Sequence, residues 1–435
     1  MSNKILYLFF LVCGLVGNVQ GQDDALSLVD CIKLAVQNNP TLRRNELSID
    51  RSDLLYRQAK YDRLPSLNGQ ISHQISQGRT INPTTNQYID ENNRSGSQSL
   101  SLNVPIFNGF SIFHNIRMKS NAFDANKLEY EGLVNELKLD VIEAYVKVLT
   151  AQDMLTQMEG QLAVTKEQLH RNQVLHREGA VNPGDYYDIK GQYSNDLNAV
   201  ELTRQSLHNA RVELAGLLNI HVQDMLSLES IDIPAQLDAT NAMTLFALSL
   251  DNLPQFKAMD WRIKEMEAGV KVARAQYWPS LSFNGGMSSN YSREGGALFQ
   301  QIKNNLSKGV GINLSIPIFN QFRARTEVRM AQVNLQEASL NREVMKNELR
   351  MRTAQAVFDL GITQKNVMNL RNQEESYAEA LRIETVHFEA GNSNSVIYLT
   401  SKNKLDYTRS QLIIKQYEWL MQKYVNDYYA GSLDL

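Results

Sequence analysis

The sequence repeats itself once, and this duplication constrains the fold more than any other feature. Gly179 recurs as Gly391, which is 212 residues later. Tyr186 recurs as Tyr398 at the same spacing. A repeat of this length is too long for one turn of a solenoid, so we interpret it as two copies of one domain.

Proline motifs mark the same two copies. Val-Pro-Ile-Phe-Asn at 104–108 recurs as Ile-Pro-Ile-Phe-Asn at 316–320. Leu-Pro-Ser-Leu at 64–67 recurs as Trp-Pro-Ser-Leu at 278–281, where the spacing is 214. The change of two residues in the spacing belongs in a loop.

Each copy contains a sharp reversal between two long helical patterns. A seam of apolar residues follows the first reversal at every seventh position: Tyr186, Tyr193, Val200, Leu207 and Leu214. At the reversal, Gly179 is expected as a C-cap glycine, Pro183-Gly184 as a turn and Asp185 as the N-cap of the next helix. These patterns predict antiparallel coiled-coil hairpins over 111–219 and 323–430.

The N-terminus is typical of a secretory signal peptide. Lys4 precedes an apolar run over 5–16, and small residues end the segment near Gly21. The run is shorter than the 20 or so residues that a spanning helix needs, and no later segment resembles one. Cys13 leaves lipidation open, and Cys31 is interpreted as a small buried apolar residue.

Four segments alternate apolar and small polar residues with a period of two. They cover 66–78, 96–106, 280–291 and 309–318. Their length of about 10 residues and their nearly uncharged polar face favour membrane strands around a water-filled lumen. Half-buried strands of a soluble sheet are the alternative, because alternation alone does not distinguish the two.

Four strands are too few for a membrane barrel. Open sheet edges are not tolerated in lipid, and bacterial barrels begin at about eight strands. The chain is therefore expected to oligomerise, and a trimer with 12 strands leaves room for a pore where a dimer with eight does not.

The predicted fold class is α+β and mostly α. The predicted organisation is a signal peptide over 1–21, a first repeat over 22–219, an equatorial linker over 220–250 and a second repeat over 251–435.

Taken together, these motifs resemble the TolC family of outer-membrane efflux and secretion channels. The resemblance covers about 24–430, and it rests on the order, spacing and duplication of the proline motifs and the two hairpin tips. It implies a homotrimer with a 12-stranded barrel in the outer membrane and an α-helical tunnel in the periplasm. The duct would be passive and would serve tripartite efflux or type I secretion.

The resemblance also implies partners and a site. A periplasmic adaptor (membrane fusion protein) would couple the tunnel to an inner-membrane transporter of the RND, ABC or MFS type. In the family the hairpin tips form the adaptor contact and the aperture. The corresponding positions here are Gly179, Ala180, Val181, Asn182, Asp185 and Asp188 in the first tip, and Gly391, Asn392, Ser393 and Asn394 in the second.

One departure from the family concerns the aperture. Relatives with a cation-sensitive entrance carry aspartates after the second tip and a basic residue within it. The matching positions here are Ile397, Thr400 and Ser393. An acidic ring is therefore not expected, and any charge at the entrance would come from Asp185 and Asp188.

Other function classes find little support. The net charge is −3, and the sequence has no stripe of basic residues that would bind nucleic acid. The seven histidines show no metal-ligand spacing, and no phosphate loop, nucleophile elbow or carboxylate pair is present, so neither an enzyme nor a cofactor is expected. A periplasmic coiled-coil scaffold or adaptor is the alternative function. An adhesin is disfavoured because both predicted loops, 78–95 and 292–308, are short.

Overall fold

The computed structural model describes residues 25–81, 86–90, 93–224, 227–234, 241–292 and 297–433. The predicted signal peptide and Cys13 lie outside these residues. No helix within them is long and apolar enough to cross a membrane.

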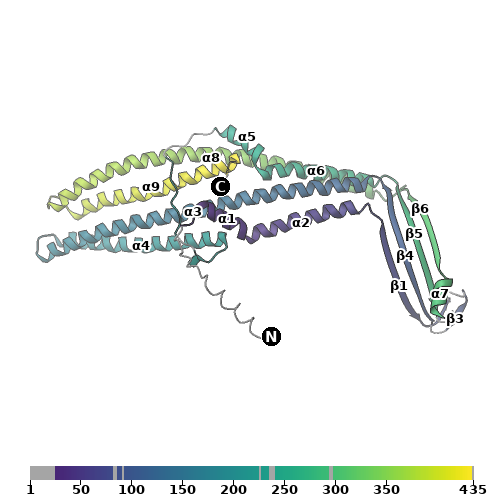
Figure 1. Ribbon diagram of the computed structural model, residues 1–435. Helices are drawn as coiled ribbons and strands as arrows, with labels where there is room; N and C mark the ends of the chain where they lie inside the picture. Colours follow the sequence, from purple (N-terminus) through teal and green to yellow (C-terminus); the bar gives the residue numbers. More distant parts are fainter. Residues whose placement is uncertain are drawn as a thin grey trace, which may run out of the picture. The chain divides into compact units, whose positions relative to one another are not determined.

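Helices dominate the described chain, and a small antiparallel sheet completes it (Figure 1). This confirms the predicted fold class. In chain order the elements are α1 (Leu28–Asn38), α2 (Pro40–Tyr61), β1 (Ser66–Ser76), β2 (Arg79–Ile81), β3 (Tyr88–Asp90), β4 (Asn93–Asn108), α3 (Ser111–Arg177), α4 (Pro183–Leu218), η1 (Val222–Asp224), α5 (Ala242–Asn252), α6 (Pro254–Ala275), β5 (Ser280–Ser292), α7 (Leu298–Asn304), β6 (Ser307–Ser315), α8 (Arg323–Glu389) and α9 (Ser395–Ala430).

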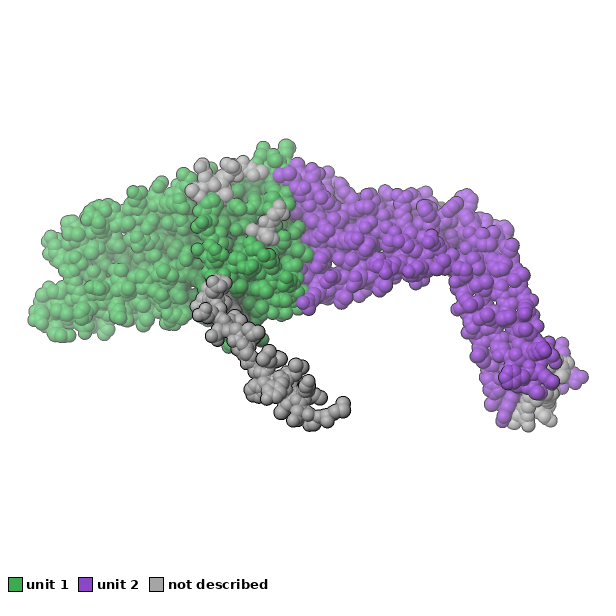
Figure 2. Space-filling model, viewed as in Figure 1, with its two compact units in different colours: residues 1–40, 134–245, 353–435 green, residues 41–133, 246–352 purple. Residues whose placement is uncertain are grey.

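The chain forms two compact units, shown in different colours in Figure 2. Unit 1 comprises 1–40, 134–245 and 353–435, and unit 2 comprises 41–133 and 246–352. Both boundaries near 133 and 352 fall inside the long helices α3 and α8, so each of these helices contributes to both units.

In unit 2, strands from both copies form one sheet. The order is β1-β4-β5-β6, and every neighbouring pair is antiparallel. The central pair, β4 and β5, joins the first copy to the second. A register shift between Pro105 and Phe107 interrupts this pair, as expected where proline has no N–H to donate to the ladder.

One face of this sheet is uncharged and, apart from Pro105 at the register shift, carries only small polar residues, glutamine and glycine. The strand registers place the same residue types side by side across all four strands. The members of this face are Ser66, Asn68, Gln70 and Ser72 on β1, Ser97, Ser99, Ser101 and Asn103 on β4, Ser282, Asn284, Gly286 and Ser288 on β5, and Ser307, Gly309, Gly311, Asn313 and Ser315 on β6.

The opposite face of the sheet is apolar and exposed. Ile71 is 84% exposed, Val310 80% and Ile312 70%. No described segment pairs with the outer edge of β1 or of β6. A sheet with one polar face, one exposed apolar face and two free edges is unsuited to water as it stands.

Two predicted loops contain regular structure. The segment 78–95 includes the short β2–β3 hairpin, and β4 begins at Asn93 rather than at residue 96. The segment 292–308 includes α7, where Gln301 bonds the backbone N–H and the carbonyl of Ser292, both at 2.9 Å. These bonds between a side chain and the backbone leave no periodic signal in a short polar sequence.

Unit 1 is built on the packed middle of α3. Val141, Ile142 and Tyr145 are fully buried there, and so is Cys31 of α1, which confirms the prediction for this cysteine. Burial raises the pKa of the Cys31 thiol to about 11. The Tyr145 hydroxyl lies 2.9 Å from the carbonyl oxygen of Leu26 and 2.7 Å from that of Glu229. It therefore fixes to the helix two segments that a parallel β-bridge between Leu26 and Leu228 holds together.

Candidate functional site

The first hairpin tip joins α3 to α4 in unit 1. After α3 ends, Gly179 adopts a φ of 70°, a left-handed conformation that favours glycine. The Ala180 N–H then donates to the carbonyl of Leu175 at 2.8 Å, which closes the helix end. The side chain of Asn182 accepts a hydrogen bond from the Gly184 N–H at 3.0 Å and so caps α4.

The second tip, between α8 and α9, repeats this geometry. Gly391 has a φ of 76°, and the Asn392 N–H donates to the carbonyl of His387 at 2.9 Å. Asn394 is the N-cap of α9, and its side chain accepts from the Ile397 N–H at 3.1 Å. The duplication in sequence is therefore also a duplication of turn geometry.

The prediction that Asp185 is the N-cap of α4 is wrong. Asn182 holds that position, and Pro183 is the first helical residue. Proline suits this place because its fixed φ is already helical and its missing N–H would have no partner in the first turn. Asp185 lies in the first turn of the helix, which leaves its carboxylate free for another contact.

An aromatic stack closes each tip from within. The rings of His176 and Tyr186 stack at 4.8 Å in the first tip. Phe388 and Tyr398 stack at 4.9 Å in the second, at positions that are 212 residues further on. Each stack joins the last turns of the incoming helix to the first turns of the outgoing one, and so stiffens the reversal.

Two carboxylates of the first tip bind the start of α9 in the second. Asp185 Oδ1 accepts the backbone N–H of Ser395 at 2.8 Å. Asp188 Oδ2 accepts the Ser395 hydroxyl at 2.8 Å. Ser395 is 1% exposed. Acidic groups are also favoured at this place because the N-terminus of a helix carries partial positive charge.

A salt bridge joins the two hairpins next to these bonds. Arg171 of α3 lies 2.6 Å from the carboxylate of Glu389 and also donates to the Glu389 carbonyl at 3.2 Å. Within the second tip, the Ser393 hydroxyl donates to Glu384. We call Arg171, Asp185, Asp188, Glu389 and Ser395 the tip latch.

The remaining predicted tip residues face outward for the most part. Val181 and Ser393 are half-buried, and the exposed set is Gly179, Ala180, Asn182, Gly391, Asn392 and Asn394. Sequence reasoning missed Arg171, Glu389 and Ser395. Their contacts to Asp185 and Asp188, or to each other, span more than 200 residues of chain, and no local pattern encodes such pairs.

A buried charged cluster also ties α4 to α9 in unit 1. Lys402 is 2% exposed, and its Nζ lies 2.6 Å from Asp406 and 3.3 Å from Asp196. The Thr165 hydroxyl and the Gln192 amide donate to Asp196 at 2.5 and 2.7 Å. Burial raises the pKa of Asp406, and Lys402 opposes this effect. Lys402 lies four residues after Tyr398 and three before Leu405, and all three are buried on α9. A lysine at such a heptad core position was the signal available in the sequence.

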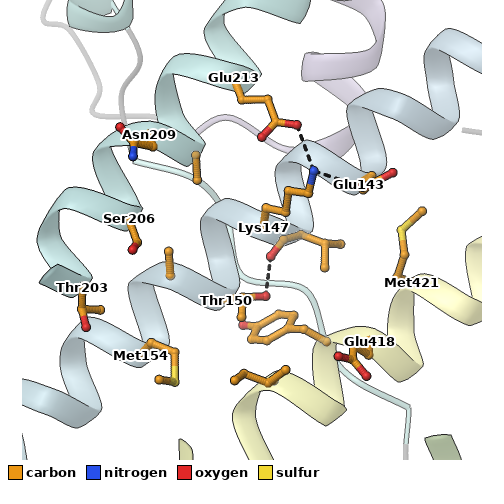
Figure 3. A pocket seen from close by; sticks show the side chains of 15 residues that line it. Glu143, Lys147, Thr150, Met154, Thr203, Ser206, Asn209, Glu213, Glu418 and Met421 are labelled. Carbon is orange, nitrogen blue, oxygen red and sulfur yellow. Dashed lines mark hydrogen bonds and ion pairs between the residues drawn. The ribbon is translucent and has the colours of Figure 1, made fainter. Parts of the chain in front are cut away.

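An open groove of about 640 Å³ lies between α3, α4 and α9 in unit 1 (Figure 3). At its rim Lys147 lies 2.9 Å from Glu213 and 3.0 Å from Glu143, and Met154 and Met421 contribute to its wall (Figure 3). The lysine is thus paired with two carboxylates in an amphipathic groove, and these hydrogen bonds raise its pKa. The described residues also contain no group of three or more side chains placed to hold a metal ion.

Comparison with known proteins relates both copies to one family. The family model described as outer membrane efflux protein matches residues 31–219 and 245–423. The chain is 22% identical to the outer membrane protein TolC of Salmonella enteritidis over 419 residues, which cover 94% of this chain and 83% of the relative. It is 24% identical to the cobalt-zinc-cadmium resistance protein CzcC of Cupriavidus metallidurans, over 77% of this chain and 78% of the relative.

Solved structures share the fold. The outer-membrane channel OprN superimposes with a TM-score of 0.80 at 19% identity, over 93% of this chain and 90% of that chain. The outer membrane protein VceC of Vibrio cholerae gives the same TM-score at 16% identity, over 93% and 96%.

Proposed function

Since the chain belongs to the outer membrane efflux protein family, we propose that it is the outer-membrane duct of a tripartite efflux or type I secretion system. Three copies would enclose a single pore, and the long helices would continue it as a tunnel in the periplasm. The duct is passive, because energy for export comes from a transporter in the inner membrane.

The sheet of unit 2 is the observation that carries this proposal. Its polar face holds Ser, Asn, Gln and Gly without a charge, which suits a water-filled lumen, and its exposed apolar face suits lipid. Lipid does not tolerate the free edges of β1 and β6. Pairing β6 of one protomer with β1 of the next closes 12 strands in a trimer.

An apolar seam on α8 supports the same assembly. Six large side chains follow one another along this helix at spacings of three, four or seven residues, and each is more than half exposed: Met330, Val333, Leu340, Val344, Met351 and Phe358. Such a seam is typical of one helix of a coiled coil. A neighbouring protomer would cover it.

The hairpin tips are the proposed docking surface for a periplasmic adaptor. They present backbone and small side chains, including Gly179, Ala180, Asn392 and Asn394, which allow close approach of a partner helix. Tyr187, which is 62% exposed, adds an aromatic anchor beside the first tip. The adaptor would couple the tips to an inner-membrane transporter of the RND, ABC or MFS type.

The tip latch is proposed to hold the tunnel entrance closed. Ile397 and Thr400 replace the aspartates of cation-sensitive relatives, so the charged contacts of this entrance lie between the two hairpins of one protomer. Asp185, Asp188 and Arg171 supply them. Parting the two hairpins would break all of these bonds together, which makes the closed state the resting one.

Single-channel conductance of the mature protein in a planar bilayer tests this proposal. The double variant Asp185→Ala/Asp188→Ala should conduct more than wild type, while Glu178→Gln, which changes an exposed carboxylate of the same tip, should not. Equal conductance of all three proteins would remove the latch from the account. A protein that inserts no channel at all would remove the duct.

A further inference from the structure

The structure also points to a lipid site on the outward face of the sheet, and this inference rests on the proposed membrane location. We propose that the apolar groove beneath α7 holds an acyl chain of a phosphorylated glycolipid of the lipid A type. The cationic rim of this groove would hold the phosphate.

The groove has two adjoining parts, of about 570 and 420 Å³. Leu100 and Met287 line both parts, so the two form one continuous apolar surface. Leu67, Leu102 and Val310 line the first part, and Ile71, Ile302 and Leu306 line the second. A groove that continues across all four strands fits a chain-like apolar ligand.

The outward face changes from apolar to polar at a defined height. Leu67, Leu102, Gly285 and Val310 form one row across the sheet, and the next row toward the loops ends in Lys308. Further rows bring Gln98 with Ser289, then His73 with Tyr291, and then Arg94. In a membrane barrel this change marks the passage from hydrocarbon to headgroups.

The charges around the groove are all of one sign. The described charged side chains of β1, β4, β5, β6 and α7 are Arg94, Lys303 and Lys308. Lys303 and Lys308 are both exposed, and the long apolar stems of such side chains lie readily along lipid while the ammonium groups reach phosphate. The rim is therefore complementary to an anionic headgroup.

The short helix α7 is held firmly against this face. Ser289 donates to the Ile302 carbonyl at 2.8 Å, and Asn305 donates to the Asn290 carbonyl at 2.8 Å. With this anchorage Phe299 remains 85% exposed, as expected for a side chain that enters the membrane interface. The helix thus forms one wall of the groove at headgroup height.

An orphaned donor points to a polar group in the ligand. The Gln98 Nε2 is buried and has no hydrogen-bond partner among the described residues, and Gln98 lines the part of the groove next to α7. Buried donors are nearly always paired. A phosphate or ester oxygen at the head of an acyl chain would supply the missing acceptor.

Native mass spectrometry of the full mature protein tests this site, with lipid A, phosphatidylglycerol and phosphatidylcholine as probes. Lipid A should remain bound to the protein through detergent removal. The variant Lys303→Gln/Lys308→Gln should bind it about 10-fold to 30-fold more weakly, as expected for the loss of two cations near a membrane surface. The variant Lys33→Gln/Lys166→Gln removes two exposed lysines elsewhere and should bind as wild type does.

A second pair of variants tests the apolar part without changing charge. A Cβ at Gly285 would lie 3.8 Å from Leu102 and Phe283, so Gly285→Leu fills the groove without a backbone clash and should weaken lipid binding. Gly311→Leu places the same bulk on the polar face and should not.

Each other outcome overturns the inference. Undiminished binding of lipid A to the variant Lys303→Gln/Lys308→Gln would show that these lysines do not bind its phosphate. Equal binding of phosphatidylcholine would show that the groove makes only nonspecific contacts with lipid. Equal binding of phosphatidylglycerol would remove the preference for a glycolipid. The same spectra give the mass of the assembly, so a trimer without bound lipid contradicts only this inference, whereas a monomer contradicts the proposed duct.

Discussion

Replacing Lys402 by methionine removes the one cation from the buried cluster and leaves both carboxylates in place. The side chain of Lys402 is 3% exposed, that of Asp196 10% and that of Asp406 16%. Water therefore does little to screen these charges. Methionine has nearly the length of lysine, so packing is disturbed less than the electrostatics.

The expected loss of stability follows from this burial. Breaking a buried ion pair by removing one partner costs about 3–5 kcal/mol, because a charge remains without compensation. The carboxylates can escape part of this cost by taking up protons, and burial already raises the pKa of Asp406. In the variant this pKa rises further, so protonation of the folded state is favoured as pH falls. The defect should therefore be largest at high pH and should shrink as pH decreases.

The duplication provides a matched control for this substitution. Lys190 is the counterpart of Lys402 in the first copy, 212 residues earlier, and it is exposed. Lys190→Met should change stability by no more than about 0.5 kcal/mol, as is usual for a surface position. Guanidinium unfolding of the detergent-solubilised protein, followed by circular dichroism at several pH values, compares the two variants. Equal midpoints for Lys402→Met and Lys190→Met, or a defect independent of pH, would refute this reasoning.

Further predictions concern single positions in both units. Burial, with smaller effects of Lys271 and Arg117, lowers the pKa of His114 from 6.5. As pH falls through 6.5, the unfolded chain therefore binds a proton at His114 before the folded chain does, and the free energy of unfolding decreases. His114→Gln should flatten this part of the plot of unfolding free energy against pH. An unchanged slope would exclude His114 as its source. Gly179→Ala places a side chain in the left-handed conformation and should lower the free energy of unfolding by about 1 kcal/mol. Gly160→Ala has open space inside α3 and should raise it by about 0.5–1 kcal/mol. Thermal unfolding should therefore give Gly160→Ala the higher midpoint, and the reverse order would contradict the turn geometry.

The hairpins and strands were predictable because their signals are local and periodic. A seam at every seventh residue from Tyr186 onward specifies a coiled-coil helix, and the alternation in 66–78 specifies a strand with two unlike faces. The duplication strengthened both predictions, since each pattern occurs twice.

The N-terminus of α4 shows where local signals compete. Asn182, Pro183 and Asp185 all have residue types that favour a helix start. Asp185 satisfied the sequence pattern for a cap, but Asn182 takes that role because Pro183 already has the helical φ. Because the helix begins three residues earlier than predicted, the Asp185 carboxylate does not cap α4 and instead binds Ser395 of the second tip.

Long-range polar contacts could not be predicted in the same way. Ser395 donates its backbone N–H to Asp185 and its hydroxyl to Asp188, which lie 210 and 207 residues earlier in the chain. A serine at a helix start gives no sign of such contacts in the sequence. The anchorage of α7 through Gln301 was equally unpredictable from the sequence, because a glutamine in a polar loop is normally expected to be exposed. Lys402 was also not predicted, although a lysine on the buried side of α9 was a signal that the sequence offered.

The mass of the detergent-purified mature protein, followed by conductance in a planar bilayer, tests the central claim most directly. We expect a mass of three chains and a channel of small conductance, because the sheet would close as a trimer and the tip latch would hold the entrance shut. A monomer or dimer that inserts no channel would contradict the 12-stranded barrel and the duct built on it.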